Sequence, residues 1–445
     1  MSSIKILEPL ARWGAQAGRD WNSVARERAH AALCDMLVCT AAGAREGAGL
    51  RVSALAGDGD CVVVGHAKRA SPQTAALING TAAHALDFDD NFSPARVHAS
   101  AVLFPALLAL GEAREAAMED ILDSFICGLE IVGRIGQLMN PRHRNRGWHA
   151  TATLGAIGAA AASARLLRLD ADKFRHALSL ASSRAGGSMI QFGVDAKPIH
   201  AGFAADAGVV AARLAYAGAT GARETIAGPK GLADLMHAGD VGGIDESSIG
   251  GPLLIETAGL KAKRFPNCAS AHRAMDALLM LIGRHGFTAR DVNEIVVEMP
   301  APQLANLMFS KPSVSAEARF SLNYALAVVL ARGAPTLEDF SDEAVRRPEL
   351  QELLPLVRPT PVDTTEIDYP QKITVILKDG RKVSETVSIP RGAAKNPFNH
   401  DEFLAKARSC LEASALAERA DVLIAAFDFS ADTPVQDLMS QYSTR

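Results

Sequence analysis

The sequence predicts a mainly α-helical protein that carries a smaller α+β part. Alanine-rich runs such as AAHAL, ATLGAIGAAAASA and GFAADAGVVAARLA favour closely packed helices, because alanine has the highest intrinsic helix propensity. Over about the first 250 residues, apolar positions recur at helical spacing. Strand-like patterns become frequent only beyond that point. We therefore expect a large helical domain and a compact α+β unit.

The helical part is expected to open with a helix over residues 21–43, for which Asn22 or Ser23 suits the N-cap position. Further helices are predicted over residues 71–86, 101–114, 118–138, 151–168, 171–185 and 200–215. Between them, CVVV after GDGD predicts one short strand over residues 60–65.

The α+β part is expected to hold the remaining strands. These are predicted over residues 261–266, 292–299, 372–377 and 382–389, with helices over 271–284 and 319–331. Helices return over residues 400–412 and 416–427. We therefore predict a helical domain built from both chain ends, residues 1–250 and 393–445, and an α+β domain over residues 251–392.

Composition excludes several classes of protein. The 46 Lys and Arg residues are outnumbered by 50 Asp and Glu, so the net charge of -4 gives no general attraction for nucleic acid or anionic lipid. The longest uncharged apolar stretch, residues 151–164, is shorter than the roughly 18 to 20 residues that span a bilayer. The six cysteines form no C-x-x-C pair, and no secretory signal is evident. We expect a cytoplasmic protein with neither a nucleic-acid nor a membrane partner.

Familiar catalytic motifs are also missing. The sequence contains no G-x-x-x-x-G-K-[ST], G-x-G-x-x-G, G-x-S-x-G or H-E-x-x-H. Nucleotide-binding folds, serine hydrolases and zinc proteases therefore lose support. The cysteine spacing gives no indication of an iron–sulfur cluster.

The densest polar segment is HALDFDDN at residues 84–91, followed by His98. If a helix continued through it, His84 and Asp87 would be i,i+3 neighbours, as would Asp87 and Asp90. Like charges so close raise at least one carboxyl pKa, which suits proton transfer near neutral pH. Spacing alone leaves three interpretations open: a proton-transfer site, a solvated helix end with capping aspartates, and a metal site of aspartate and histidine.

Two further segments place titratable groups before alanine-rich helices. His149 follows GW at or near a helix N-terminus, where the dipole lowers an imidazole pKa and backbone N–H groups attract an anion. Lys197 and His200 lie in a predicted turn that leads into the next helix. A capping histidine or a surface cation is an equally ordinary role for these residues. A functional site is indicated only if the fold brings them close to other titratable groups.

Residues 261–272, KAKRFPNCASAH, form the second dense polar segment. Its cations, Lys263 among them, can bind a carboxylate, and Cys268 and His272 follow closely. The alternative is a basic strand end with a buried cysteine. Tyr324 fits an ordinary core residue by its helix position.

These segments resemble the motifs of the MmgE/PrpD family, whose members include 2-methylcitrate dehydratases, cis-aconitate decarboxylases and an iminodisuccinate epimerase. The most specific is NGTAAHALDFDD at residues 79–90, followed by HAS at 98–100, where the family commonly has His-Pro-Ser. In the same order come GWHxTxTLG at 147–155, KPxHxG at 197–202, KRFPxCxxxH at 263–272 and EARFS at 317–321. The resemblance covers nearly the whole chain.

The resemblance implies a helical domain and a smaller α+β lid with the active site in the cleft between them, a homodimer, and no iron–sulfur cluster. We expect neither a cofactor nor a metal. Carried over position by position, the family's active-site residues are Asp87, His98, His149, Lys197, Lys263, Cys268, His272 and Tyr324. Cys268 stands where some decarboxylases have histidine and many dehydratase-like members have cysteine. Asn91, at a position where several relatives carry threonine, also departs from the decarboxylase pattern and is expected to face the substrate.

The leading hypothesis is a cofactor-independent hydro-lyase that acts on a small di- or tricarboxylic hydroxy acid, resembling 2-methylcitrate dehydratase. Asp87 and His98 would form the base side, and His149 would deliver a proton to the leaving hydroxyl. Lys197 and Lys263 would bind substrate carboxylates. Tyr324 and His272 would position the substrate.

Four alternatives stay open. A decarboxylase of the cis-aconitate type and an epimerase of an iminodisuccinate-like dicarboxylate share the same family and the same need for proton transfer beside a carboxylate. A carboxylate-binding protein of the same fold without catalysis is the non-enzyme alternative. A metal-dependent hydratase is the remaining one.

Overall fold

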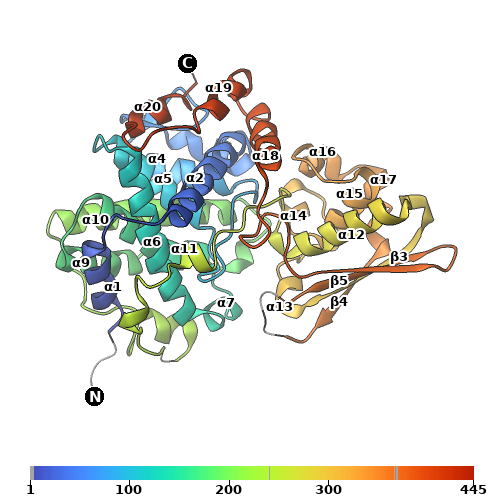
Figure 1. Cartoon of the computed structure of the whole chain (residues 1–445), viewed down its shortest axis with the longest axis horizontal. Coiled ribbons are helices and arrows are strands. Elements are labelled where there is room, and N and C mark those ends of the chain that lie inside the picture. Colours follow the sequence, from blue (N-terminus) through green and yellow to red (C-terminus); the bar gives the residue numbers. More distant parts are fainter. Residues whose placement is uncertain (1–4, 240, 365, 367–368, 445) are drawn as a thin grey trace. The chain divides into compact units, whose positions relative to one another are not determined.

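The computed structural model describes residues 5–239, 241–364, 366 and 369–444. The chain divides into two compact units. Unit 1 comprises Met1–Gln191, Asp195–Lys261 and Cys410–Arg445, and unit 2 comprises Phe192–Val194 and Ala262–Ser409. Both ends of the chain therefore contribute to unit 1 (Figure 1). Most elements are helices, which confirms the prediction of a mainly α protein.

Unit 1 is a helical assembly with one two-stranded ribbon. Its helices are α1 (Leu7–Gln16), α2 (Ser23–Gly43), α3 (Gly47–Val52), α4 (Pro72–His84), α5 (Ala99–Glu112), α6 (Met118–Met139), α7 (Arg142–Asn145), α8 (Ala150–Leu166), α9 (Ala171–Ser182), α10 (Ala196–Tyr216), α11 (Leu254–Thr257), α19 (Ala420–Ala425) and α20 (Val435–Ser440). The ribbon pairs β1 (Cys61–Val62) with β2 (Arg69–Ala70) in antiparallel fashion. None of the described helices is long and apolar enough to cross a membrane.

Side-chain caps explain where several of these helices begin. Asn22 accepts a hydrogen bond from the backbone N–H of Ala25, so α2 starts where the sequence predicts. Ser71 caps α4, which has Pro72 in its first turn, where a missing N–H costs nothing. Asp170 caps α9 in the same way. These caps fix the helix starts independently of the tertiary packing.

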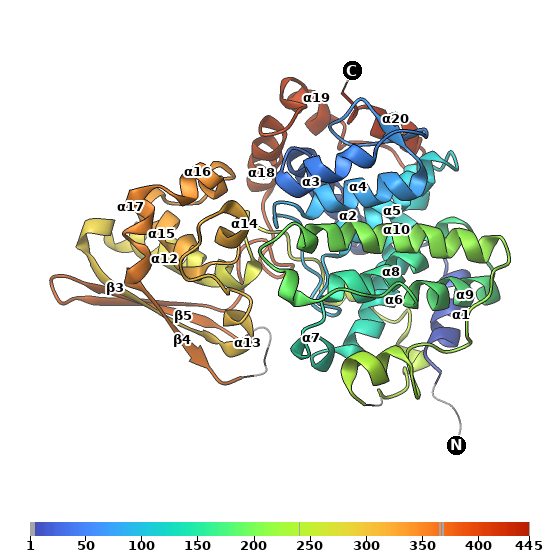
Figure 2. The ribbon, with the colours of Figure 1, turned by 180° about the vertical axis from the view of Figure 1, so that it is seen from behind.

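Helix α10 packs closely against both α4 and α8 in unit 1, and it lies between these two helices in Figure 2. Small residues permit this approach. A methyl group on Gly202 of α10 would lie 2.2 Å from the carbonyl oxygen of Leu77, and one on Gly208 would lie 2.3 Å from the Cβ of Ala159. The alanine and glycine content of these helices therefore sets the distance between their axes.

Unit 2 is an α+β unit built on a four-stranded sheet. Its strands are β3 (Val292–Pro300), β4 (Val357–Val362), β5 (Gln371–Leu377) and β6 (Lys382–Val387), in the order β4-β3-β5-β6. Its helices are α12 (His272–His285), α13 (Ala301–Leu304), α14 (Ser315–Ala318), α15 (Leu322–Arg332), α16 (Asp342–Val345) and α17 (Pro348–Gln351). Helix α18 (His400–Glu412) runs across the boundary between the two units.

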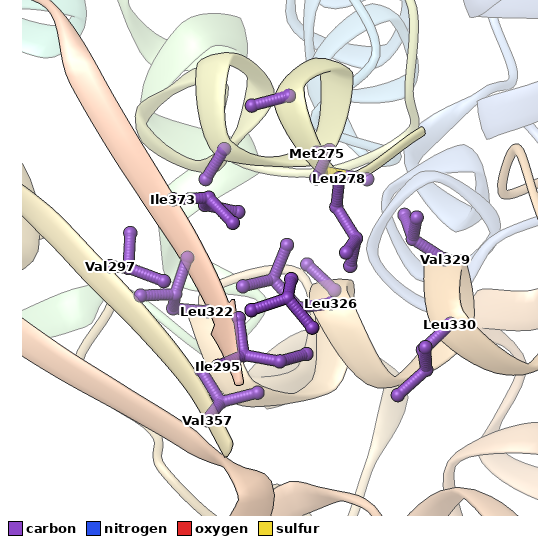
Figure 3. Close-up of a cluster of buried hydrophobic side chains, with 14 of the residues drawn as sticks. Met275, Leu278, Ile295, Val297, Leu322, Leu326, Val329, Leu330, Val357 and Ile373 are labelled. Atoms are coloured by element: carbon purple, nitrogen blue, oxygen red, sulfur yellow. The ribbon is translucent and has the colours of Figure 1, made fainter. Parts of the chain in front are cut away.

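One hydrophobic cluster joins the sheet to α12 and α15. Figure 3 shows Ile295, Val357 and Ile373 from the strands beside Leu278 and Leu326 from the helices. The alternating burial along β5 directs every second side chain into this cluster. The sheet therefore has one face covered by helices, as expected for an α+β unit.

Strand β4 was not predicted, because Pro359 and Pro361 interrupt its strand pattern. The strand lies at the edge of the sheet and pairs parallel to β3. An edge strand tolerates proline, since one side of its backbone needs no donor for a neighbour. This position in the sheet cannot be read from local sequence.

Three other predictions about elements need correction. Residues 261–266 form no strand, because the backbone of Lys261 makes a single bridge to Asn91 and no neighbouring strand continues it. The helix expected over 416–427 is limited to α19 and a preceding short 3₁₀ turn. Helix α10 starts at Ala196, before the predicted residue 200, because Pro198 fits its first turn.

Candidate active site

The polar segment after α4 leaves the helix instead of extending it. Helix α4 ends at His84, and Asp87 adopts a left-handed conformation with φ of 50°. Aspartate tolerates this conformation better than most residues, so the chain turns sharply here. The expected i,i+3 relations among His84, Asp87 and Asp90 are therefore wrong. The turn instead folds the segment back toward the end of α4.

Lys197 supplies the cation of the resulting cluster. Its Nζ donates to Oδ1 of Asp87 at 2.6 Å and to Nε2 of His84 at 2.7 Å. Only 4% of the Lys197 side chain and 5% of the Asp87 side chain are exposed. Because charge-assisted hydrogen bonds strengthen away from water, this contact fixes the ammonium group between α10 and the end of α4.

Asp89 connects two imidazoles. Its carboxylate lies 2.9 Å from Nδ1 of His84 and 3.0 Å from Nδ1 of His98. An ionised carboxylate only accepts hydrogen bonds, so both Nδ1 atoms carry hydrogen. Nε2 of His84 is then the acceptor for Lys197, and Nε2 of His98 lies 3.9 Å from Oδ1 of Asp87. The network thus assigns one tautomer to each ring.

The electrostatics agree with these assignments. Burial lowers the pKa of His84 to about 3, and Lys197 acts in the same direction while Asp89 opposes it. Burial disfavours ionisation of Asp89, but the adjacent His84 and His98 outweigh it and hold its pKa well below the ordinary value. Asp89 is therefore a buried anion, and His84 is neutral.

Asp90 lies behind this cluster at the start of α5. Its Oδ1 accepts from the backbone N–H of Ser100 at 3.4 Å, and its Oδ2 accepts from the Ser100 hydroxyl. Burial raises the pKa of Asp90 to about 7, and the neighbouring carboxyls of Asp35 and Asp89 raise it further while Ser100 opposes them. His98 is the N-cap residue of α5. Asp90 thus satisfies one of the backbone N–H groups in the first turn of this helix that have no partner within the helix.

His149 occupies the N-cap position of α8, as the sequence predicts. Its ring stacks near His84, with centroids 6.1 Å apart, and its Nδ1 lies 3.1 Å from Nδ1 of His200 on α10. Burial lowers the pKa of His149 well below its ordinary value, and the charge of Lys197 adds to this. The starts of α5, α8 and α10 and the end of α4 thus bring the titratable groups together.

The same residues have the donor types that a divalent cation uses. Ligand atoms of His84, Asp87, Asp89 and His98 all lie within 4.8 Å of one another. The ammonium group of Lys197 contacts two of these four residues and supplies a positive charge there. A lysine, two carboxylates and two imidazoles thus share one buried cluster.

The structure brings together four of the predicted site residues, namely Asp87, His98, His149 and Lys197. Asn91 continues the same loop. Its backbone pairs with Lys261, and its side-chain Nδ2 is buried without a hydrogen-bond partner among the described residues.

The other predicted substrate-binding residues belong to unit 2. Lys263 is buried there, and Nε2 of His272 lies 2.9 Å from Oδ1 of Asn267. Cys268 is partly exposed, and its backbone N–H donates to the carbonyl of Arg319. Their assignment to substrate binding stays a prediction.

Tyr324 lies in a different environment from the titratable cluster. It is fully buried in unit 2 within a hydrophobic cluster that includes Phe340, and its hydroxyl donates to the backbone carbonyl of Asp339. Burial raises the pKa of Tyr324, and Asp339 adds to the effect. The side chain thus packs in the core of unit 2, and its catalytic role stays a prediction.

Sequence reasoning assigned no role to three residues of the cluster. His84 and Asp89 were part of the quoted motif, but their function as partners of Lys197 and His98 depends on the turn at Asp87. His200 was placed in a turn, whereas it lies on α10, one helical turn beyond Lys197. The available signal was the concentration of histidines in the matching motifs.

Comparisons with known proteins agree with the resemblance of the motifs. Residues 8–242 match the MmgE/PrpD N-terminal domain, and residues 265–429 match the MmgE/PrpD C-terminal domain. Cis-aconitate decarboxylase of Homo sapiens is 30% identical over 362 residues, which cover 77% of this chain and 73% of the human protein.

Two fungal proteins extend the likeness. Cis-aconitate decarboxylase of Aspergillus terreus is 27% identical, covering 98% of this chain and 96% of its own length. A cis-aconitate decarboxylase-like protein of Aspergillus oryzae is also 27% identical, covering 88% of this chain and 87% of its own. Matches to both domains, together covering most of the sequence, show that the chain belongs to the MmgE/PrpD family.

Proposed function

We propose that the protein is a lyase that decarboxylates a small unsaturated tricarboxylate of the cis-aconitate type, without a metal or an organic cofactor. The observation that carries this proposal is the buried network in which Lys197 contacts Asp87 and His84 while Asp89 contacts His98. The three relatives compared above carry cis-aconitate decarboxylase in their names, which favours this reaction over the dehydration expected from the sequence.

The proposed reaction needs one proton per turnover. The bond between an allylic carbon and its carboxylate breaks, and its electron pair forms a new carbon–carbon double bond. The original double bond moves its electrons to a carbon that takes up a proton, so a tricarboxylate and one proton give a dicarboxylate and CO₂. The protein must therefore supply an acid beside the alkene carbon and positive charge beside the carboxylates.

His98 is the proposed proton donor. Its side chain is 12% exposed, more than His84, Asp87, Asp89 or Lys197, so it is the group of the network best able to meet a substrate. The carboxylate of Asp89 at Nδ1 holds the ring and stabilises its protonated form, as in other aspartate–histidine pairs. Nε2 of His98 would then carry the proton that reaches carbon.

Lys197 is proposed to neutralise charge at the reacting end of the substrate. Asp87 and His84 restrain its ammonium group, so little reorganisation is needed when the anion binds. Asn91 is proposed to donate its buried Nδ2 hydrogens to a substrate oxygen.

Dehydration of a hydroxy acid such as 2-methylcitrate is the second candidate. It is favoured by Cys268, which stands where the family's dehydratase-like members have cysteine and some decarboxylases have histidine. The same network would serve it, with His98 removing a proton from carbon and His149 protonating the leaving hydroxyl.

A substrate panel distinguishes these reactions. The purified, chelator-treated protein is incubated with cis-aconitate, citrate, 2-methylcitrate and iminodisuccinate, and CO₂ release, alkene formation and α-proton exchange are followed. We expect CO₂ release from cis-aconitate that survives exhaustive chelation. Alkene formation from a hydroxy acid alone would establish the dehydratase, and exchange alone would establish the epimerase.

Activity that disappears on chelation and returns with a divalent ion would overturn the metal-free part of the proposal. A control variant is Lys197→Met, which removes the ammonium group and should abolish turnover in the presence or absence of added metal.

A further inference from the structure

His98 and His149 differ in their partners at Nδ1. His98 has the carboxylate of Asp89 at 3.0 Å, whereas His149 has the imidazole of His200 at 3.1 Å between the two Nδ1 atoms. Both His149 and His200 are buried, with 5% and 7% of their surfaces exposed. The partner of each ring decides which charge state the surroundings can support.

A pair of imidazoles joined through their Nδ1 atoms shares a single hydrogen. If both nitrogens carried hydrogen they would repel each other, and if neither did no bond would form. One ring is therefore the donor at Nδ1 and the other the acceptor. When both rings are neutral, the donor ring has a bare Nε2 and the acceptor ring carries its hydrogen there, so the tautomer of His149 is tied to that of His200.

The backbone holds both rings in this arrangement. The N–H of His149 donates to the carbonyl of Gly187 at 3.0 Å, and a methyl group at Gly187 would lie 3.3 Å from Cε1 and Nε2 of His200. Gly187 has φ of 149°, which L side chains rarely adopt. The loop thus fits closely against His200 and keeps it beside His149.

The charges around His149 act in the same direction. Burial lowers the pKa of His149, and the Lys197 ammonium and the imidazoles of His84, His200 and His98 lower it further. Burial also lowers the pKa of His200, with Lys197 adding to the effect.

We propose that His200 is a positioning residue that holds His149 as a neutral hydrogen-bonding group of fixed tautomer, so that His98, backed by Asp89, alone carries the transferred proton. This division of roles rests on the proposed function. It separates two imidazoles that sequence alone would assign to either acid or base. Environments that differ in this way are how a site gives similar groups different tasks.

Replacement of His200 by aspartate and by asparagine tests the proposal, because the two side chains have the same shape and differ in charge. Labelled histidine is introduced, the His149 signals are assigned with His149→Asn, and their pH titration is followed by NMR. We expect the pKa of wild-type His149 to lie well below its ordinary value, so that the ring stays neutral at neutral pH. His200→Asp should raise its titration by about 1 to 3 pH units, while His200→Asn should leave it neutral.

A structural control is His176→Asn, which removes another histidine whose Nδ1 accepts a backbone N–H in unit 1. This variant should leave the His149 titration unchanged, even if it lowers the melting temperature. Titration of wild-type His149 near its ordinary value, or identical behaviour in His200→Asp and His200→Asn, would overturn the positioning role.

Turnover separates this inference from the proposed function. With a substrate found in the panel, His200→Asn should keep at least about a tenth of the wild-type kcat. In His200→Asp, the pH profile of kcat should shift upward by the same amount as the His149 titration. The NMR result needs no substrate. A wild-type protein without decarboxylase activity would therefore refute the proposed function while leaving the His149–His200 arrangement tested on its own.

Discussion

At the scale of single residues, Asp89 is the group on which the proposed chemistry depends most. It accepts from His84 and His98 through one carboxylate, so it orients both rings and stabilises a protonated His98. Asp89→Asn keeps the shape but offers an amide in place of an anion. We expect kcat to fall by about 10² to 10⁴-fold with a much smaller change in KM, because tautomer and charge are lost but binding groups remain.

Steady-state kinetics of Asp89→Asn and of the control variant Asp206→Asn test this prediction. Asp206 is a suitable control because it is an α10 carboxylate that pairs with Arg184 at the surface. The control should retain wild-type kcat. Equal kcat in Asp89→Asn and wild type would contradict the role of Asp89.

The pair of Lys197 and Asp87 couples stability to activity. Lys197→Met leaves Asp87 buried without its cation, which costs on the order of 3 to 5 kcal/mol in the free energy of unfolding. Adding Asp87→Asn removes the unpaired charge, so the double variant should regain part of the lost stability and none of the activity. Urea unfolding and kcat measurements on the two variants test this prediction. Recovery of activity in the double variant would contradict the proposed role of Lys197.

The residue scale also shows what the sequence could reveal about the site. Asp87, His98, His149 and Lys197 were predicted because they lie in specific motifs. His84, Asp89 and His200 received no roles, because their contacts depend on the left-handed turn at Asp87 and on the early start of α10. Tyr324 matched by position, but only the packing of unit 2 reveals that its hydroxyl bonds to the backbone.

At the scale of elements, Asp90 links the site to the start of α5. Its pKa near 7 lies above the ordinary value of 3.8, so between about pH 4 and pH 7 the folded chain holds a proton that the unfolded chain has released. The free energy of unfolding therefore falls as pH rises through this window, and this contribution is constant above it. The Asp90→Asn side chain does not titrate but can still form a hydrogen bond with Ser100. Its free energy of unfolding should therefore not show this decrease with pH.

Urea unfolding at several pH values checks this prediction for Asp90→Asn. The three tryptophans, Trp13, Trp21 and Trp148, all lie in unit 1, so their fluorescence reports on the unit that contains Asp90. The stability of Asp90→Asn relative to wild type should rise from pH 4 to pH 7. A constant difference across this range would show that Asp90 is ionised throughout.

The packing of α8 against α10 gives a matched pair of glycine variants. A methyl group on Gly208 would lie 2.3 Å from Cβ of Ala159, whereas one on Gly155 would meet nothing closer than 3.5 Å. Gly208→Ala must push α10 away and should cost about 1 to 3 kcal/mol or more, with a loss of activity because α10 carries Lys197. Gly155→Ala should be tolerated.

Tryptophan fluorescence during urea unfolding and kcat test both glycine variants. A Gly208→Ala protein as stable and active as Gly155→Ala would show that α10 can shift without disturbing the site. The alanine-rich sequences of α8 and α10 explain why both could be predicted as helices, while the distance between them could not be predicted.

At the scale of the whole molecule, the sequence predicted a mainly α protein with a smaller α+β part. Alanine-rich runs and recurring apolar positions identified the long helices of unit 1, most of whose residues are buried. The sequence pattern missed β4 and wrongly predicted a strand over 261–266, because strand pairing is decided by neighbours distant in sequence. The homodimer and the cytoplasmic location remain predictions from the sequence.

Family membership and the site together support the proposed decarboxylation of a cis-aconitate-like acid, without a metal, by the buried network of Lys197, Asp87, Asp89 and His98. Each turnover would place one proton from the solvent-exchangeable pool on carbon. This stoichiometry distinguishes decarboxylation from dehydration, which needs no net proton.

The most direct measurement is NMR of cis-aconitate with the chelator-treated protein in deuterated buffer, with wild type and Asp89→Asn side by side. We expect loss of CO₂ and one deuterium on carbon in the dicarboxylate product of the wild type, with at least about a hundredfold slower conversion by the variant. Unchanged cis-aconitate with the wild type, or equal rates for the two proteins, would refute the proposed function.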